Sequence, residues 1–176
     1  MGLLGVLTVG ALALAGCQGD AGDKGSEPNA GCDLISAESL AQITGGQDLF
    51  VTGGHIDQDE RSYLSCDVLT TGSPTDLVRI LAYDIGGEEA RTNAEETRRG
   101  QQEAGPCEDI TPLPGDDGYL CTRADRVQID ASVALEDRLV RFTFYEDAQL
   151  DEVTPENVRA WAKEVDDRVR ELDDSR

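Results

Sequence analysis

The chain has 176 residues, which is enough for one globular domain with flanking segments. It carries 36 aspartates and glutamates against 15 lysines and arginines, a formal net charge of −21. Because a charge of this sign repels phosphate groups, it argues against nucleic acid as a partner and against adsorption to anionic lipid headgroups.

The chain begins with an apolar run, residues 3–14, that is followed by Ala15, Gly16 and Cys17. The run has the length of a signal-peptide centre and is too short for a membrane-spanning helix, which needs about 20 residues. A signal peptide usually starts with a basic residue, and none precedes Leu3. The apolar run and the small residues after it nevertheless predict a signal peptide over residues 1–16.

Leu14 to Cys17 resembles the lipobox of bacterial lipoproteins. The resemblance implies cleavage before Cys17 and a diacylglyceryl group on its sulfur, which would anchor the chain to the outer face of the cell membrane. Two acyl chains, at about 0.8 kcal/mol per buried CH₂, suffice for stable attachment. The alternative is an ordinary signal peptide, with Cys17 free or paired. Residues 17–31 carry no large apolar side chain after the cysteine, so we expect a flexible tether there.

Four cysteines remain after Cys17, and this even number in an exported chain predicts two disulfides. Three connectivities are possible. We favour Cys32 with Cys66 and Cys107 with Cys121, because each pair then closes a short loop between neighbouring elements. A zinc site is disfavoured, because the chain has one histidine and no Cys-x-x-Cys.

The domain is expected to begin with a short helix at its N-terminal end. Ser36 can cap this helix and Gly45 can end it in a left-handed turn. Residues 46–61 contain Gly53, Gly54 and a polar end, and we interpret them as a loop or irregular hairpin.

Alternating apolar and polar side chains predict six strands. They cover residues 62–69, 77–83, 110–113, 119–123, 127–135 and 140–144. The first two form a hairpin, and residues 110–113 form a short edge strand because prolines limit it. In the last two strands the polar side chains share one face, which we expect to be exposed to solvent: Gln128, Asp130, Ser132, Arg141 and Thr143.

Two further helices follow from composition and spacing. Residues 88–103 favour a helix with so few large apolar side chains that it should lie shallowly on the sheet, with a break at Gly100. Thr154 can cap a C-terminal helix whose apolar stripe includes Trp161 and extends to Leu172. Trp161 at this helical spacing indicates a core residue, although an exposed indole could also serve as a ligand platform.

These elements predict an α+β fold, with an antiparallel sheet of about five to six strands, flanking helices and a C-terminal amphipathic helix packed on the sheet. Residues 32–172 would form the single domain, and residues 173–176 a disordered tail.

The sequence contains no motif of a nucleophilic or cofactor-dependent enzyme. His55 is the lone histidine, and a single loop histidine is more often exposed than catalytic. Acidic residues in two turns offer oxygen ligands for calcium, although neither turn has the EF-hand spacing: Asp57, Asp59 and Glu60, and Asp116 and Asp117. We therefore predict no catalytic residue, no cofactor and no metal ligand.

From residue 32 onward the layout resembles a family of small actinobacterial lipoproteins of unassigned function. The shared features are the lipobox, a short tether, Cys32 with Leu34 and Ile35 at a helix start, a strand with Cys66, a second cysteine pair and a C-terminal amphipathic helix. Asp67 departs from the family, which often has an aromatic residue there. The resemblance implies an envelope location and an α+β domain, and it brings no catalytic residues.

Together these observations predict a lipid-anchored lipoprotein of the cell envelope that acts as a non-catalytic binding or interaction module. Its partners would be the membrane, through the lipid on Cys17, and an envelope protein or a small ligand. The alternatives are a hydrolase that uses carboxylates alone and an accessory solute-binding component of a transporter.

Overall fold

The computed structural model describes residues 33–175 apart from 59–60, 72–75, 116 and 125–126. The predicted signal peptide, Cys17, the tether and Cys32 lie outside the described residues, and so do Asp59, Glu60 and Asp116.

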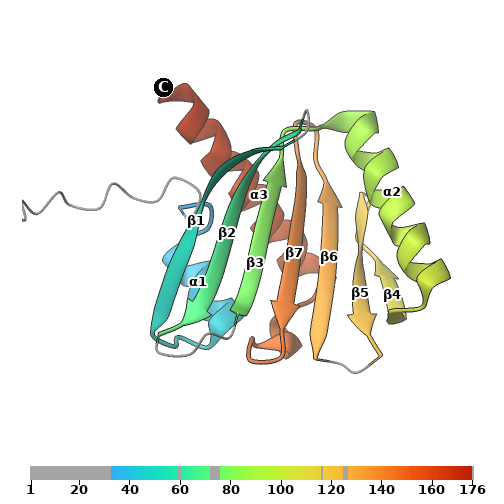
Figure 1. Ribbon diagram of the computed structural model, residues 1–176, viewed down its shortest axis with the longest axis horizontal. Helices are drawn as coiled ribbons and strands as arrows, with labels where there is room; N and C mark the ends of the chain where they lie inside the picture. Colours follow the sequence, from blue (N-terminus) through green and yellow to red (C-terminus); the bar gives the residue numbers. More distant parts are fainter. Residues whose placement is uncertain (1–32, 59–60, 72–75, 116, 125–126, 176) are drawn as a thin grey trace, which may run out of the picture.

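Seven strands form one antiparallel sheet, in the order β1-β2-β3-β7-β6-β5-β4 (Figure 1). The predicted α+β fold with an antiparallel sheet is confirmed, and the strand count is higher than the five to six expected. The strands are β1 (Leu49–Gln58), β2 (Arg61–Thr70), β3 (Asp76–Tyr83), β4 (Cys107–Pro112), β5 (Gly118–Arg123), β6 (Gln128–Ala134) and β7 (Leu139–Tyr145).

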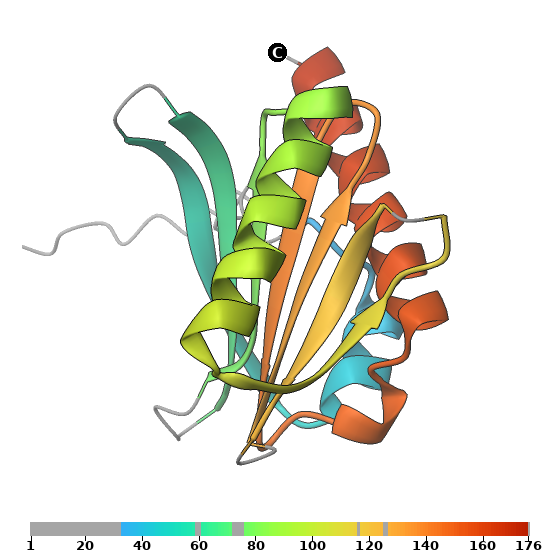
Figure 2. The same ribbon diagram turned by 90° about the vertical axis from the view of Figure 1, so that its right-hand side faces the viewer.

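Helices lie on both faces of this sheet. They are α1 (Ala37–Thr44), α2 (Gly87–Ala104), the 3₁₀ turn η1 (Leu150–Glu152) and α3 (Pro155–Asp174). Figure 2 shows α1 and α3 on one face and α2 on the opposite face. Helix α2 lies mainly over β4, β5, β6 and β7, and Tyr83 of β3 also packs against it.

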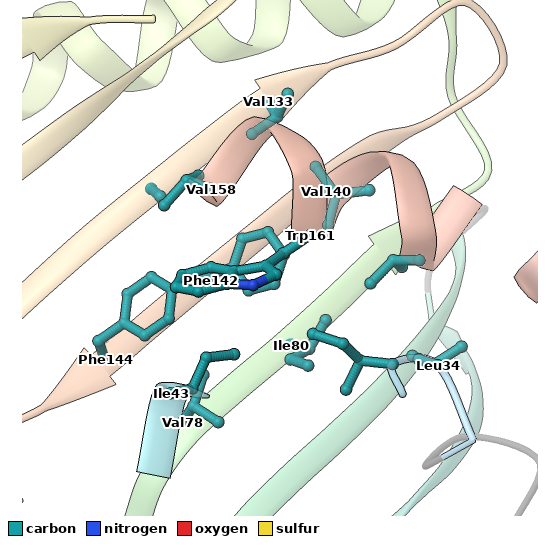
Figure 3. Packing of buried hydrophobic residues seen from close by; sticks show 14 of the residues in the cluster. Leu34, Ile43, Val78, Ile80, Val133, Val140, Phe142, Phe144, Val158 and Trp161 are labelled. Carbon is teal, nitrogen blue, oxygen red and sulfur yellow. The ribbon is translucent and has the colours of Figure 1, made fainter. Parts of the chain in front are cut away.

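The main core lies between the sheet and the layer of α1 and α3. Alternate residues of the central strands point into it, and Figure 3 shows Phe142 and Phe144 of β7 beside Trp161 of α3. The Phe144 and Trp161 ring centroids are 5.8 Å apart, and Trp161 is 2% exposed. The interpretation of Trp161 as a core residue is therefore confirmed.

A smaller cluster joins α2 to the other face. Ala90 and Ala94 are buried against Leu139 and Tyr83, so the helix lies shallowly as predicted. The predicted break at Gly100 is wrong, because α2 continues to Ala104. A single glycine in an exposed helix costs only about 1 kcal/mol, which the rest of the helix outweighs.

The predicted helix caps are confirmed. The Ser36 hydroxyl accepts a hydrogen bond from the Ser39 amide, and Gly45 ends α1 with a φ of 71°. The Thr154 hydroxyl accepts from the Asn157 amide at the start of α3. These short contacts depend on neighbours in the chain, so local sequence is enough to predict them.

The prediction of a loop or irregular hairpin over residues 46–61 is wrong in its main part. Residues 49–58 form β1, and every one of them pairs with a residue of β2. Gly53 and Gly54 weaken the intrinsic preference for a strand, which is why the sequence reads as a loop. The backbone bonds to β2 supply the stability that the side chains lack.

Two other boundaries differ from expectation. The edge strand β4 begins at Cys107 and ends at Pro112, so it is longer than the predicted residues 110–113. Helix α3 continues through Asp174, so residues 173 and 174 belong to the helix and not to a disordered tail.

The predicted disulfide between Cys107 and Cys121 is confirmed. It joins β4 to β5 across a Cα–Cα distance of 5.4 Å. Cys66 is fully buried in the main core. Its predicted pairing with Cys32 stays a prediction, because Cys32 is not among the described residues.

Candidate functional site

The face of the sheet that bears α2 carries the polar side chains of the strands. Register places Ser132 between Tyr119 and Arg141, and Arg141 beside Leu81. Residues directly opposite each other in a sheet point to the same face. These four side chains therefore form a row across β5, β6, β7 and β3.

A second row lies parallel to the first, two residues along each strand. Asp130 pairs with Thr143, Thr143 with Arg79, and Arg79 with Asp67. Neither row is predictable from the pattern of one strand, because β3 and β7 are neighbours in the sheet and distant in the chain.

A hollow of about 440 Å³ lies over these rows. Strands β3, β5, β6 and β7 form its floor, and Thr97 and Gln101 of α2 form one wall. Its charged lining consists of three arginines and one aspartate, an excess of positive charge on a chain of net charge −21: Arg79, Arg123, Arg141 and Asp130.

Two of the three arginines are paired with carboxylates. Arg79 Nε lies 2.5 Å from Asp67 Oδ1, and this hydrogen bond raises the pKa of the Arg79 guanidinium. Arg123 Nε lies 3.2 Å from Asp130 Oδ2. The other oxygen of Asp130 accepts from Gln128 and Thr143, so protein donors occupy both of its oxygens.

Arg141 is held differently. Its Nη2 donates to Asn93 Oδ1 and to Thr97 Oγ1, both at 2.7 Å and both neutral acceptors on α2. Its guanidinium also lies over the Tyr83 ring, 5.4 Å from the centroid. No carboxylate in the described part of the chain pairs with Arg141. Its positive charge is therefore fixed in position and not neutralised by a counter-charge.

Two polar atoms on this floor have no protein partner. Ser132 is 1% exposed, and its Oγ makes no hydrogen bond to any described residue. The same holds for Nε of Arg141, which is also buried. Buried polar atoms are satisfied in the great majority of cases, so these two atoms on neighbouring strands depart from the usual pattern.

Tyr119 closes the row beside Ser132. Burial raises the pKa of its hydroxyl to about 12, so it stays neutral and protonated at physiological pH. It lines the hollow but is 2% exposed, so it contributes little accessible surface to it.

The prediction that the polar face of β6 and β7 is exposed to solvent is partly wrong. Arg141 and Thr143 are half-buried and Ser132 is buried, because α2 packs over β5, β6 and β7. The alternation in β6 and β7 does identify these polar residues as a group. It cannot show that a helix covers them, since α2 is almost free of large apolar side chains.

A second hollow, of about 300 Å³, lies between α2 and the strands β4 and β5. Its basic and acidic residues are balanced, with Arg91 and Arg98 against Glu95 and Asp117. Arg98 is bound to Glu95 at 2.5 Å. This balance makes it a weaker candidate for a charged ligand.

His55 lies on β1 and not in a loop as predicted, and its side chain is exposed as expected. Its Nε2 is 3.0 Å from Ser62 Oγ. The contact is between exposed side chains, so it carries no catalytic assignment.

The acidic turns do not form a metal centre in the described residues. No group of three or more His, Cys, Asp or Glu side chains there could hold a metal ion. Asp117 is paired with Arg159 at 2.9 Å. The carboxyl group of Asp57 lies outside the described part, like those of Asp59, Glu60 and Asp116.

Comparison with known proteins adds no relative. The chain matches no protein-family model, no curated protein and no solved structure. The resemblance to small actinobacterial lipoproteins therefore stays a prediction. Of the helices described, none combines the length and apolar character needed to cross a membrane.

Proposed function

We propose that the protein is a non-catalytic binding module of the cell envelope, with its ligand position in the hollow between α2 and strands β3, β5, β6 and β7. The observation that carries this proposal is Arg141, which lines the hollow and is held by the neutral side chains Asn93 and Thr97, beside the buried and unpartnered hydroxyl of Ser132. Binding sites are concave, are formed mainly by rigid elements and present a few convergent polar groups.

A binding role is favoured over a carboxylate-dependent hydrolase. Hydrolysis of that kind needs a carboxyl group that can exchange a proton with the substrate. The hollow contains one carboxylate, Asp130, and protein donors occupy both of its oxygens. It is placed to fix Arg123 and Thr143 and not to face a substrate.

The envelope location is proposed from the sequence. The apolar run and the lipobox at Cys17 support a lipid anchor on the outer face of the cell membrane. The protein from its native host should fractionate with membranes and carry a diacylglyceryl mass increment at Cys17. The Cys17→Ser variant should lose both properties, and retention of membrane attachment by this variant would refute the anchor.

The binding proposal is tested by mapping small-molecule contacts on the protein. A panel of anionic, cationic and neutral small molecules is titrated while backbone amide signals are followed by NMR. We expect saturable shifts that centre on β6, β7 and the Thr97 turn of α2. The Leu81→Trp variant, which fills the hollow, should abolish them.

Thr52→Trp is the matched control. Thr52 is exposed on β1 and lies on the same face of the sheet as Asp67, outside the lining of the hollow. This variant should bind as the wild type does. Shifts that centre elsewhere, or that survive Leu81→Trp, would overturn the assignment of the hollow.

A further inference from the structure

The two unsatisfied donors on the floor of the hollow define what kind of group it can take. Ser132 and Arg141 are direct partners in the β6–β7 register, so their Cβ atoms are about 4.5–5.5 Å apart. Ser132 Oγ and Arg141 Nε are both buried, so a ligand oxygen that enters the hollow first meets the exposed part of the Arg141 guanidinium, next to the Ser132 side chain. Arg141 can only donate hydrogen bonds, so this position favours an acceptor on the ligand, to which the Ser132 hydroxyl can also donate.

Charge selects an anion. Asn93 and Thr97 hold the guanidinium of Arg141 without neutralising it, whereas Asp67 and Asp130 neutralise the other two arginines of the hollow. One positive charge thus stays uncompensated in a partly buried position, where its field is screened less than at the surface. A ligand oxygen that carries negative charge forms the stronger, charge-assisted hydrogen bond.

The single uncompensated positive charge of the hollow favours a ligand with one negative charge. Only one guanidinium is uncompensated, Asp130 lies one row away, and the whole chain carries −21. A phosphate dianion would bring a second negative charge that nothing in the described hollow balances. A carboxylate brings one.

The side chains that line the hollow determine which contacts the rest of the ligand can make. Leu81, Tyr119 and Tyr145 line it, and burial keeps both phenols protonated by raising their pKa values. Most of the accessible lining is polar, so Leu81 and the ring of Tyr145 are the apolar contacts open to the body of a ligand. The volume of about 440 Å³ lies within the range of small-molecule sites, roughly 300–1,000 Å³.

We propose that the hollow binds a small organic monocarboxylate, whose carboxylate is bound by the guanidinium of Arg141 beside Ser132. This inference rests on the proposed binding function and names the ligand class for the same site.

The test compares matched probes on the full-length protein. Benzoate, 3-phenylpropionate and hexanoate are titrated beside benzamide, 3-phenylpropionamide and hexanamide, with inorganic phosphate as a further probe. Affinity is followed by NMR shifts of the β6 and β7 amides. We expect each carboxylate to bind at least tenfold more tightly than its amide, and phosphate to bind more weakly than the carboxylates.

Variants assign the preference to the two donors. Arg141→Gln should reduce carboxylate affinity at least tenfold and leave amide affinity within twofold. Ser132→Ala should reduce it severalfold. Arg98→Gln removes the same charge from the second hollow and is the control, with an expected change below twofold. An equal loss in Arg98→Gln would mean that net charge and not the site sets the affinity, which would overturn the proposal.

The outcomes separate the two proposals. Equal binding of acids and amides in the hollow would overturn the carboxylate class and leave the binding function standing. Tighter binding of phosphate would likewise overturn the class. If no probe of any charge shifts the residues of the hollow, the binding function itself falls. The acid–amide comparison uses wild-type protein, so it holds even if a variant does not fold.

Discussion

Arg138 and Asp166 form a nearly buried ion pair between the β6–β7 turn and the middle of α3. Arg138 Nε lies 3.3 Å from Asp166 Oδ1, and the two side chains are 9% and 6% exposed. Neither atom makes a hydrogen bond to a described residue, so the contact is chiefly one of charge. Arg138 also donates to Asp173 at 2.8 Å, which connects the turn to the last part of α3.

Removing the arginine should destabilise the fold strongly, because it leaves the buried Asp166 with only the exposed Arg170. We expect Arg138→Met to lower the free energy of unfolding by about 3–5 kcal/mol, as measured by urea denaturation. Arg168→Met is the control, since Arg168 pairs with Glu171 at the surface, and its effect should be small. Similar losses in both variants would show that the buried pair has no special role.

Glu164 connects α3 to the start of α1, and its protonation should weaken this connection. Its carboxylate accepts from the Ser36 amide at 2.5 Å and the Ser39 hydroxyl at 2.7 Å. Burial acts to raise the pKa of Glu164, but these hydrogen bonds outweigh burial, and the pKa is lowered from 4.5. The stabilisation is therefore present above pH 4.5 and is lost as pH falls through the folded-state pKa.

The Glu164→Gln variant should accordingly lose less stability than the wild type between neutral and acidic pH. Urea denaturation at a series of pH values measures this difference. Asp167→Asn, an exposed position on the same helix, should keep the wild-type profile. An unchanged acid dependence in Glu164→Gln would contradict the argument.

Tyr119 should govern part of the alkaline stability. Burial raises its pKa from 10.0 to about 12, so the folded state holds the phenolic proton more tightly than the unfolded state does. The resulting stabilisation is complete below pH 10 and is lost as pH rises from 10 to about 12. Tyr119→Phe should be less sensitive to pH in this window, and ultraviolet titration should lack one late phenolate transition.

Gly118 lies where the backbone approaches closely. A Cβ atom at this position would overlap the carbonyl oxygen of Ser132 on the neighbouring strand. We expect Gly118→Ala to destabilise the protein by about 1–3 kcal/mol through forced backbone movement. Gly100 in α2 has no atom within 4 Å of such a Cβ, so Gly100→Ala should stabilise by about 0.5–1 kcal/mol. Thermal unfolding of the two variants distinguishes these opposite signs.

The Cys107–Cys121 disulfide ties the edge strand β4 to the sheet across a sequence separation of 14 residues. A loop of this size stabilises by about 3 kcal/mol in the chain-entropy account. The double variant Cys107→Ala, Cys121→Ala should therefore unfold at lower urea concentration. Peptide mapping without reduction should recover the two cysteines in one linked peptide, and it also tests the predicted pairing of Cys32 with Cys66.

Local pattern was enough to predict the elements whose stability depends on near neighbours. The alternation of Val140, Phe142 and Phe144 identifies the buried face of β7, and the spacing of Val158, Trp161 and Val165 that of α3. These assignments hold because strand and helix periods place side chains on a face whatever the partner is. The prediction missed β1 for the complementary reason. Its two glycines remove the local signal of a strand, and the strand forms through backbone pairing with β2.

Local pattern grouped the polar residues of β6 and β7, but their assembly into a site depended on tertiary structure. Arg141 donates a hydrogen bond to Asn93, which lies 48 residues away in the sequence. Ser132 is buried because α2 lies over its strand. In the sequence both residues read as members of a solvated face. Composition thus determined that the chain is acidic, and local residue patterns predicted its α+β fold. The packing of α2 on the sheet decided which arginine has no carboxylate partner. Electrostatic attraction depends on the distance between two charged groups in space and not on their separation in the sequence.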